Sequence, residues 1–191
     1  ITKNIKSIGY GFNLIEKEKI DFLEKIKKSK FFIKNKLYDL EPGIVCKNGW
    51  HTKLVNVKKD CNTMWLSTQA CVYQSSLLQN ILFDETLGKY SYLEDLFFSY
   101  ELHKRGSLSL CHEAKYFHLN NIDRKNIKFG IKEVVNRHKF VKKNNLVSYK
   151  FYITILLKIL LNLVKVFTFR LNLVPKLIGN LIGLILCTIR R

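Results

Sequence analysis

The sequence predicts an α/β fold followed by two apolar helices. In residues 1–145, stretches with helical periodicity alternate with short runs typical of strands, which is the pattern of an α/β domain. Apolar residues make up 47% of the 191 residues, enough for a sizeable core, so wholesale disorder is excluded. From residue 146 onward the sequence turns into two long apolar stretches. We therefore expect an α/β domain over residues 1–145 and a membrane-associated helical tail over residues 146–191.

The first sixty residues predict one helix and three short strands. The segment from Glu16 to Lys28 has its apolar residues on one side and its lysines on the other, which predicts an amphipathic helix. Short apolar runs beside the turn signals Pro42-Gly43 and Asn48-Gly49 predict strands. These strands are Phe31–Ile33, Gly43–Cys46 and Lys53–Val57.

Residues 64–143 continue the alternation. An almost uncharged run, Met64–Tyr73, predicts a buried strand or a pocket wall, and a serine at position 75 or 76 is expected to cap a short helix that ends at Ile81. Apolar periodicity predicts a second helix over Leu93–Arg105, which Gly106 ends. The remaining predicted elements are the short strands Leu108–Cys111 and Ala114–His118 and a basic helix, Ile127–Lys143.

An acidic pair opens the second of these helices. Ser91 and Glu94 match the capping-box pattern S-x-x-E. Glu94 and Asp95 would then lie in the first helical turn, where the helix dipole favours anions. Taken alone, the pair is explained as a helix cap.

The order of motifs over residues 65–118 suggests a further role for the pair. An apolar strand leads into a short helix, a Phe-Asp-Glu turn, the Glu-Asp pair, an Arg-Gly helix end, two short strands and a histidine. These parts are Leu66–Tyr73, Ser75–Ile81, Phe83–Glu85, Glu94–Asp95, Arg105–Gly106 and His118. In this order the sequence resembles, over roughly residues 40–145, the C-terminal half of the catalytic domain of inverting family-2 glycosyltransferases, which have the Rossmann-like GT-A fold.

The resemblance implies the transfer of a sugar, with inversion, from a nucleotide-sugar donor to a hydroxyl of a glycan or lipid-linked acceptor. It implies that Asp95 is the general base that takes the proton of the acceptor hydroxyl, and that Glu94 orients the base or the acceptor. It also implies that His118 is a ligand of a divalent metal, Mg²⁺ or Mn²⁺, on the donor diphosphate. A half-buried position at a strand end is the alternative for His118.

Two further residues are candidates for substrate binding. Arg105 could contact a phosphate group. The alternative is that it is only a basic residue at the end of a helix. Trp65 could stack on a sugar ring, and core packing is the alternative.

The chain departs from that family in its N-terminal half. No Asp-x-Asp occurs in the 191 residues, and no glycine-rich phosphate loop follows a strand. The chain begins with Ile1, and its only methionine is Met64. We therefore expect it to be the C-terminal part of a longer enzyme, without the donor-binding half.

The tail contains two apolar stretches, residues 151–169 and 171–189, each about as long as a membrane span of about 20 residues. Each stretch has one narrow stripe of polar or small residues at helical spacing. The stripes are Thr154, Lys158, Asn162 and Lys165, and Lys176, Asn180, Gly183 and Cys187. Because a span would bury Lys158 at roughly 3 kcal/mol, we predict helices that lie in the membrane interface, with lysines reaching the headgroups. A helical hairpin packed on protein is the alternative.

The net charge of +18 is concentrated in the tail. Residues 120–191 hold 15 basic and 2 acidic residues, a net charge of +13. This basic stretch favours the anionic, cytoplasmic leaflet of a membrane as a partner. A lysine-rich codon bias explains part of the total charge, and no recognition motif that would indicate nucleic-acid binding accompanies it. A non-enzymatic, basic membrane-binding module is therefore the alternative to a glycosyltransferase.

Overall fold

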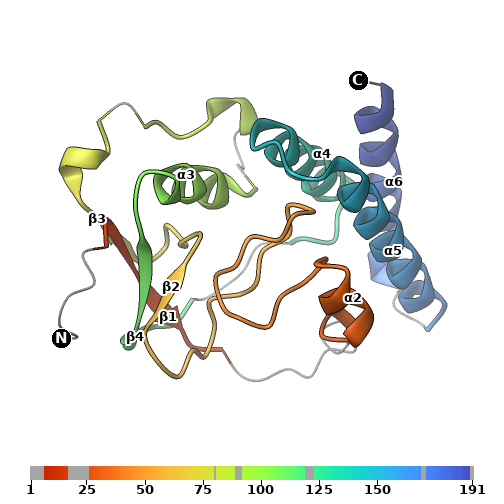
Figure 1. Ribbon diagram of the computed structural model, residues 1–191. Helices are drawn as coiled ribbons and strands as arrows, with labels where there is room; N and C mark the ends of the chain where they lie inside the picture. Colours follow the sequence, from red (N-terminus) through yellow and green to blue (C-terminus); the bar gives the residue numbers. More distant parts are fainter. Residues whose placement is uncertain are drawn as a thin grey trace. The chain divides into compact units, whose positions relative to one another are not determined.

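The computed structural model describes residues 7–16, 26–79, 81–88, 92–118, 123–168 and 171–189, and these form a mixed α/β structure (Figure 1). The chain divides into two compact units. The sheet unit contains residues 1–28, 38–45 and 51–119, and the helical unit contains residues 29–37, 46–50 and 120–191. The predicted α/β class is confirmed, whereas the predicted domain boundary at residue 145 stays a prediction.

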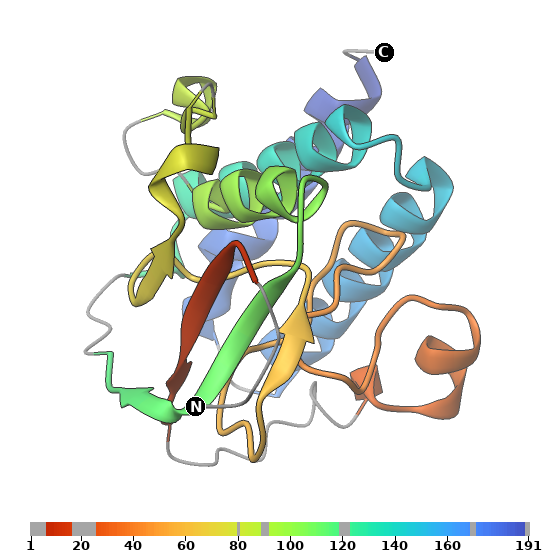
Figure 2. The same cartoon turned by 60° about the vertical axis from the view of Figure 1, so that its left-hand side comes forward.

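A four-stranded mixed sheet forms the centre of the sheet unit (Figure 2). Its strands are β1 (Gly9–Leu14), β2 (Cys61–Thr63), β3 (Cys71–Tyr73) and β4 (Leu108–Tyr116), in the spatial order β2-β4-β1-β3. β1 runs parallel to β4 and antiparallel to β3, and β2 runs antiparallel to β4. The sheet therefore joins the beginning of the unit to its end.

Strand β1 contains two glycines because side chains from neighbouring segments occupy the space above it. A Cβ atom on Gly9 would lie 2.5 Å from a ring carbon of Tyr73, and one on Gly11 would lie 2.5 Å from a methyl carbon of Leu66. Glycine at both positions thus permits this close packing.

Four of the strand predictions are wrong in their type or extent. Phe31–Ile33 lies within the short helix α2 (Lys30–Lys34). The predicted strand Met64–Tyr73 is extended only over β3, and residues 64–70 form a loop. The two strands predicted after Gly106 are one continuous strand, β4, because all of its residues pair with β1 or β2 or bridge a register shift.

The other two predicted strands contribute single bridges. Val45 pairs with His51, and Val55 pairs with Leu14. Most of the helix predicted over residues 16–28 lies outside the described residues.

The longer helices follow the sequence closely. They are α3 (Glu94–His103), α4 (Ile127–Lys143), α5 (Ser148–Phe167) and α6 (Val174–Ile189). The predicted helix after position 75 is a single 3₁₀ turn, η1 (Ser75–Leu77), whose N-cap is Gln74 instead of a serine. Two further 3₁₀ turns are η2 (Glu85–Leu87) and η3 (Leu171–Leu173).

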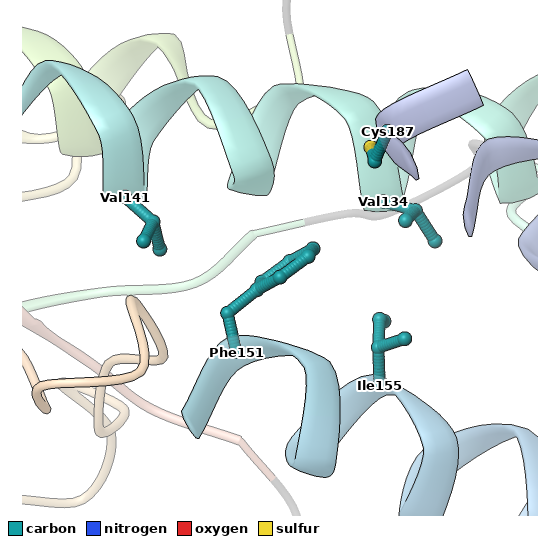
Figure 3. Close-up of a cluster of buried hydrophobic side chains, with 5 residues drawn as sticks. All are labelled: Val134, Val141, Phe151, Ile155 and Cys187. Atoms are coloured by element: carbon teal, nitrogen blue, oxygen red, sulfur yellow. The ribbon is translucent and has the colours of Figure 1, made fainter. Parts of the chain in front are cut away.

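Each unit has its own buried side chains. In the sheet unit, Leu66, Leu96, Leu102 and Leu108 are 0–1% exposed. In the helical unit, Phe151 and Ile155 of α5 point toward Val134 and Val141 of α4, with Cys187 of α6 beside them (Figure 3).

Candidate functional site

The acidic pair follows a backbone conformation that side-chain-bearing residues seldom adopt. α3 begins at Glu94, and its N-cap, Leu93, has a left-handed backbone with φ +77° and ψ +11°. No side chain caps the helix. The predicted capping box of Ser91 and Glu94 is therefore wrong, because the N-cap is two residues later than that motif requires; Ser91 lies outside the described residues. Strained backbone of this kind costs about 1–3 kcal/mol and tends to occur at functional sites.

A buried hydroxyl fixes the first turn of α3 to the loop between β2 and β3. Ser99 is fully buried, and its hydroxyl donates a hydrogen bond to the backbone carbonyl of Asp95. The same oxygen accepts a hydrogen bond from the Leu66 amide, at 3.0 Å. Ser99 thus positions the turn that carries Asp95 against residues 64–70.

Asp95 is partly exposed, and three titratable side chains of the sheet lie within its electrostatic reach. Burial raises the pKa of Tyr73, of Tyr116 and of Cys71, and the negative charge of Asp95 raises each pKa further. These groups come from β3 and from the carboxyl end of β4. All three therefore stay protonated at neutral pH, so the phenols can donate hydrogen bonds beside the carboxylate.

His118 lies just beyond the end of β4 and is exposed. Its Nε2 atom lies 3.1 Å from the side-chain nitrogen of Gln69, in the loop that Ser99 contacts. Among the described residues, no three His, Cys, Asp or Glu side chains are grouped so that they could hold a metal ion. Within the described ranges His118 would therefore supply a single ligand, and its role in metal binding stays a prediction.

The two candidate substrate-binding residues lie elsewhere. Trp65 is buried, its ring meets that of His51 edge-on with centroids 4.4 Å apart, and its indole N–H donates to the Thr52 carbonyl. This position agrees with core packing. Arg105 is exposed beyond the far end of α3, roughly 15 Å along the helix axis from Asp95 at 1.5 Å per residue. The structure therefore does not bring Arg105 to the acidic pair.

Sequence reasoning missed a histidine–aspartate pair in the sheet unit. His112 Nδ1 lies 2.6 Å from Asp60 Oδ1, and the same oxygen accepts the His112 amide. No local signal reveals this pair, because the two residues are brought together only by the pairing of β2 with β4.

In the helical unit, one carboxylate holds two lysines. Glu133 of α4 is 6% exposed, and its oxygens lie 2.5 Å from Lys158 Nζ of α5 and 3.3 Å from Lys176 Nζ of α6. Asn180 of α6 donates to the same carboxylate, at 3.2 Å, and to the carbonyl of Gly130. Burial alone would raise the pKa of Glu133, but the two lysines outweigh it and lower the pKa to about 2.

The polar stripes of the tail therefore face protein. Thr154, Asn162 and Asn180 are buried, and the Lys158 and Lys176 side chains are 21% and 17% exposed. The prediction that the stripe lysines reach lipid headgroups is wrong for these two residues, because Glu133 attracts both to the inside of the helical unit.

The apolar faces of the two tail helices point outward instead. Six large apolar side chains of α5 and five of α6 are exposed. They are Ile153, Leu156, Leu160, Leu163, Val164 and Phe167 in α5, and Ile178, Leu181, Ile182, Ile185 and Ile189 in α6. Among the described residues, the helical stretch Leu171–Ile189 is long and apolar enough to cross a membrane. The polar stripes thus face the inside of the helical unit beside its apolar core, while broad apolar faces are exposed; helices of a water-soluble bundle expose their polar faces instead.

Comparison with known proteins adds no relative. The chain matches no protein-family model, and neither curated proteins nor solved structures gave a significant match.

Proposed function

We propose that this chain is the acceptor-side part of an inverting glycosyltransferase, with Asp95 as the general base. In such a reaction the acceptor oxygen attacks the anomeric carbon, its proton passes to the carboxylate, and the nucleoside diphosphate leaves with the electrons of the broken bond. The 191 residues contain no Asp-x-Asp, and the proposal assigns donor binding to chain outside them.

The observation that carries the proposal is the setting of Asp95. The carboxylate is partly exposed, its turn is held by the buried Ser99, and Tyr73 and Tyr116 lie close enough to feel its charge. A general base needs this combination of a fixed position and access for a hydroxyl. The resemblance of residues 65–118 to the glycosyltransferase motif order supports the same role for this residue.

The test is the stereochemistry of transfer by the complete enzyme that the proposal requires. Incubation with a panel of nucleotide sugars and extracted membrane lipids is expected to release nucleoside diphosphate. NMR of the product is expected to show the anomeric configuration opposite to that of the donor. Retention of configuration would remove Asp95 from the role of base, and absence of release with every donor would reject the proposal.

A second candidate function, binding to a membrane surface, rests on the outward apolar faces of α5 and α6. Eleven exposed large apolar side chains on two neighbouring helices form more apolar surface than scattered exposure explains. Basic residues are abundant on the neighbouring α4, which includes Lys128, Lys142 and Lys143 among its exposed side chains. Apolar surface beside positive charge is typical of proteins that bind anionic membranes.

Vesicle flotation tests this function. The protein is expected to float with vesicles of phosphatidylcholine and phosphatidylglycerol, and less with phosphatidylcholine alone, because α4 attracts anionic headgroups. High salt is expected to weaken the difference, since it screens exposed charges. A protein that stays at the bottom of the gradient with both vesicle types would refute membrane binding.

A further inference from the structure

We propose that α5 and α6 lie flat in one leaflet of an anionic membrane and that neither crosses it, although the helical stretch Leu171–Ile189, which contains α6, has the length and apolarity of a span. This inference rests on the second candidate function, membrane binding, and names how the membrane is bound. Its main support is the way α6 packs along α4.

α4 and α6 run side by side in the same direction. Gly179 of α6 meets α4 at the Ile127 carbonyl and at Gly130, and a Cβ atom on Gly130 would lie 2.5 Å from the Lys176 carbonyl. One turn further along both helices, Gly183 meets Val134. The glycines permit contact between the two backbones, as in closely packed helix pairs.

The contact continues to the C-terminal end of α6. Cys187 lies beside Val134 in the buried cluster that also contains Val141 (Figure 3), and its carbonyl accepts a hydrogen bond from Tyr152, whose hydroxyl also lies 3.4 Å from His138. Most of α6 is thus fastened to α4 between Ile127 and Val141. Any tilt of α6 through a bilayer would carry α4 with it.

α4 carries too many basic residues to enter the hydrocarbon region of a membrane, because the free energy of burying their charges is too high. It carries Lys128, Lys132, Arg137, Lys139, Lys142 and Lys143. A single lysine or arginine at the centre of a membrane-spanning helix costs about 3 kcal/mol. Six such residues on one helix exclude a transmembrane position for α4, and α6 shares that restriction through their packing.

An anionic lipid surface fits the exposed parts of these helices, which are apolar on α5 and α6 and basic on α4. Because Glu133 of α4 reaches Lys158 and Lys176, α4 lies over the inner stripes of both tail helices, and their apolar faces point away from it. A helix in the interface buries its apolar face about 5–10 Å deep, close to the diameter of one helix. α4 and its lysines then lie at the level of the headgroups, where anionic lipid complements their charge.

Tryptophan depth measurements test the orientation. Ile178 and Ile185 lie on the exposed face of α6, seven residues or about 10 Å apart along the axis. Ile178→Trp and Ile185→Trp variants of the whole chain are bound to phosphatidylcholine–phosphatidylglycerol vesicles that carry bromine at shallow or deep positions of the acyl chain. The wild-type fluorescence of Trp50 and Trp65 is the background, and flotation of each variant is the control for binding.

Flat helices are expected to give the same quenching profile at both positions, strongest with shallow bromine. Profiles that differ in depth would overturn the flat orientation while leaving membrane binding intact. Variants that float but are not quenched at either position would show that something other than lipid covers this face, and would also overturn it. Variants and wild-type protein that all fail to float would refute membrane binding itself, without bearing on sugar transfer by the sheet unit.

Discussion

Asp95→Asn is expected to lower the rate of sugar transfer by the complete enzyme about 100- to 10,000-fold, the usual contribution of a general base. Asparagine has nearly the shape of aspartate but cannot accept a proton from the attacking hydroxyl. The fold is expected to survive, because the hydrogen bond from Ser99 goes to the backbone carbonyl of residue 95 and is retained. The measurement is nucleoside diphosphate release, with circular dichroism as the check on structure.

Asp84→Asn is the matched control. Asp84 is an aspartate of the same unit whose carboxylate accepts the amide and the hydroxyl of Thr86 at the start of η2, so it shapes a turn. This variant is expected to retain most of the activity. Equal losses in the two variants would indicate a general effect on the sheet unit, and near-normal turnover of Asp95→Asn would show that another group is the base.

Glu133→Gln is expected to lower the free energy of unfolding of the helical unit by about 3–5 kcal/mol, because it leaves Lys158 and Lys176 partly buried without a counter-charge. Denaturant unfolding, followed by hydrogen exchange of α4–α6, measures this loss. Glu101→Gln is the control, since Glu101 pairs with Lys104 on an exposed helix face and such pairs contribute only about 0.3–0.5 kcal/mol.

The stability that Glu133 contributes to the helical unit is also expected to depend on pH. Its pKa in the fold, about 2, is lower than its ordinary value of 4.5, so its stabilising effect is complete above that ordinary value. The effect is lost as the pH falls through about 2, and Glu133→Gln lacks this part of the acid transition. Replacing Glu133, Lys158 and Lys176 together with leucine is expected to restore stability, and failure of this triple variant would contradict an electrostatic origin.

Helices could be predicted from this sequence much better than strands. α4 has the predicted ends because a strong apolar period coincides with an N-cap, Asn126, whose side chain accepts the Phe129 amide. Strand β1 was not predicted, since its glycines suit a strand only when Tyr73 and Leu66 occupy the space above them. The three-residue apolar run at Phe31–Ile33 fits a helix and a strand equally well.

Some residues of the candidate site could likewise be predicted from the sequence and others could not. The order of motifs predicted Glu94 and Asp95 as site residues, which stays a prediction. It did not indicate Ser99, Tyr73 or Tyr116, because contacts across separate elements leave no local pattern. In the tail, the periodicity correctly separated a polar stripe from an apolar face. It could not indicate which of the two meets protein, since the partner of the stripe, Glu133, lies on another helix.

The two units contain alternating stretches of the chain, so some residues of the helical unit are synthesised long before the residues that they contact. Residues 46–50 belong to the helical unit although they are made long before its helices. Asn48, which is fully buried, donates to the hydroxyl of Thr154, a residue 106 positions later, and the Gly49 carbonyl accepts from Arg137. At about 5–20 residues per second, a ribosome needs roughly 5–20 s to supply Thr154. During that interval the 46–50 turn lacks Thr154 and Arg137, two of the residues that hold it in the fold, and we expect it to be more open to chaperones and proteases.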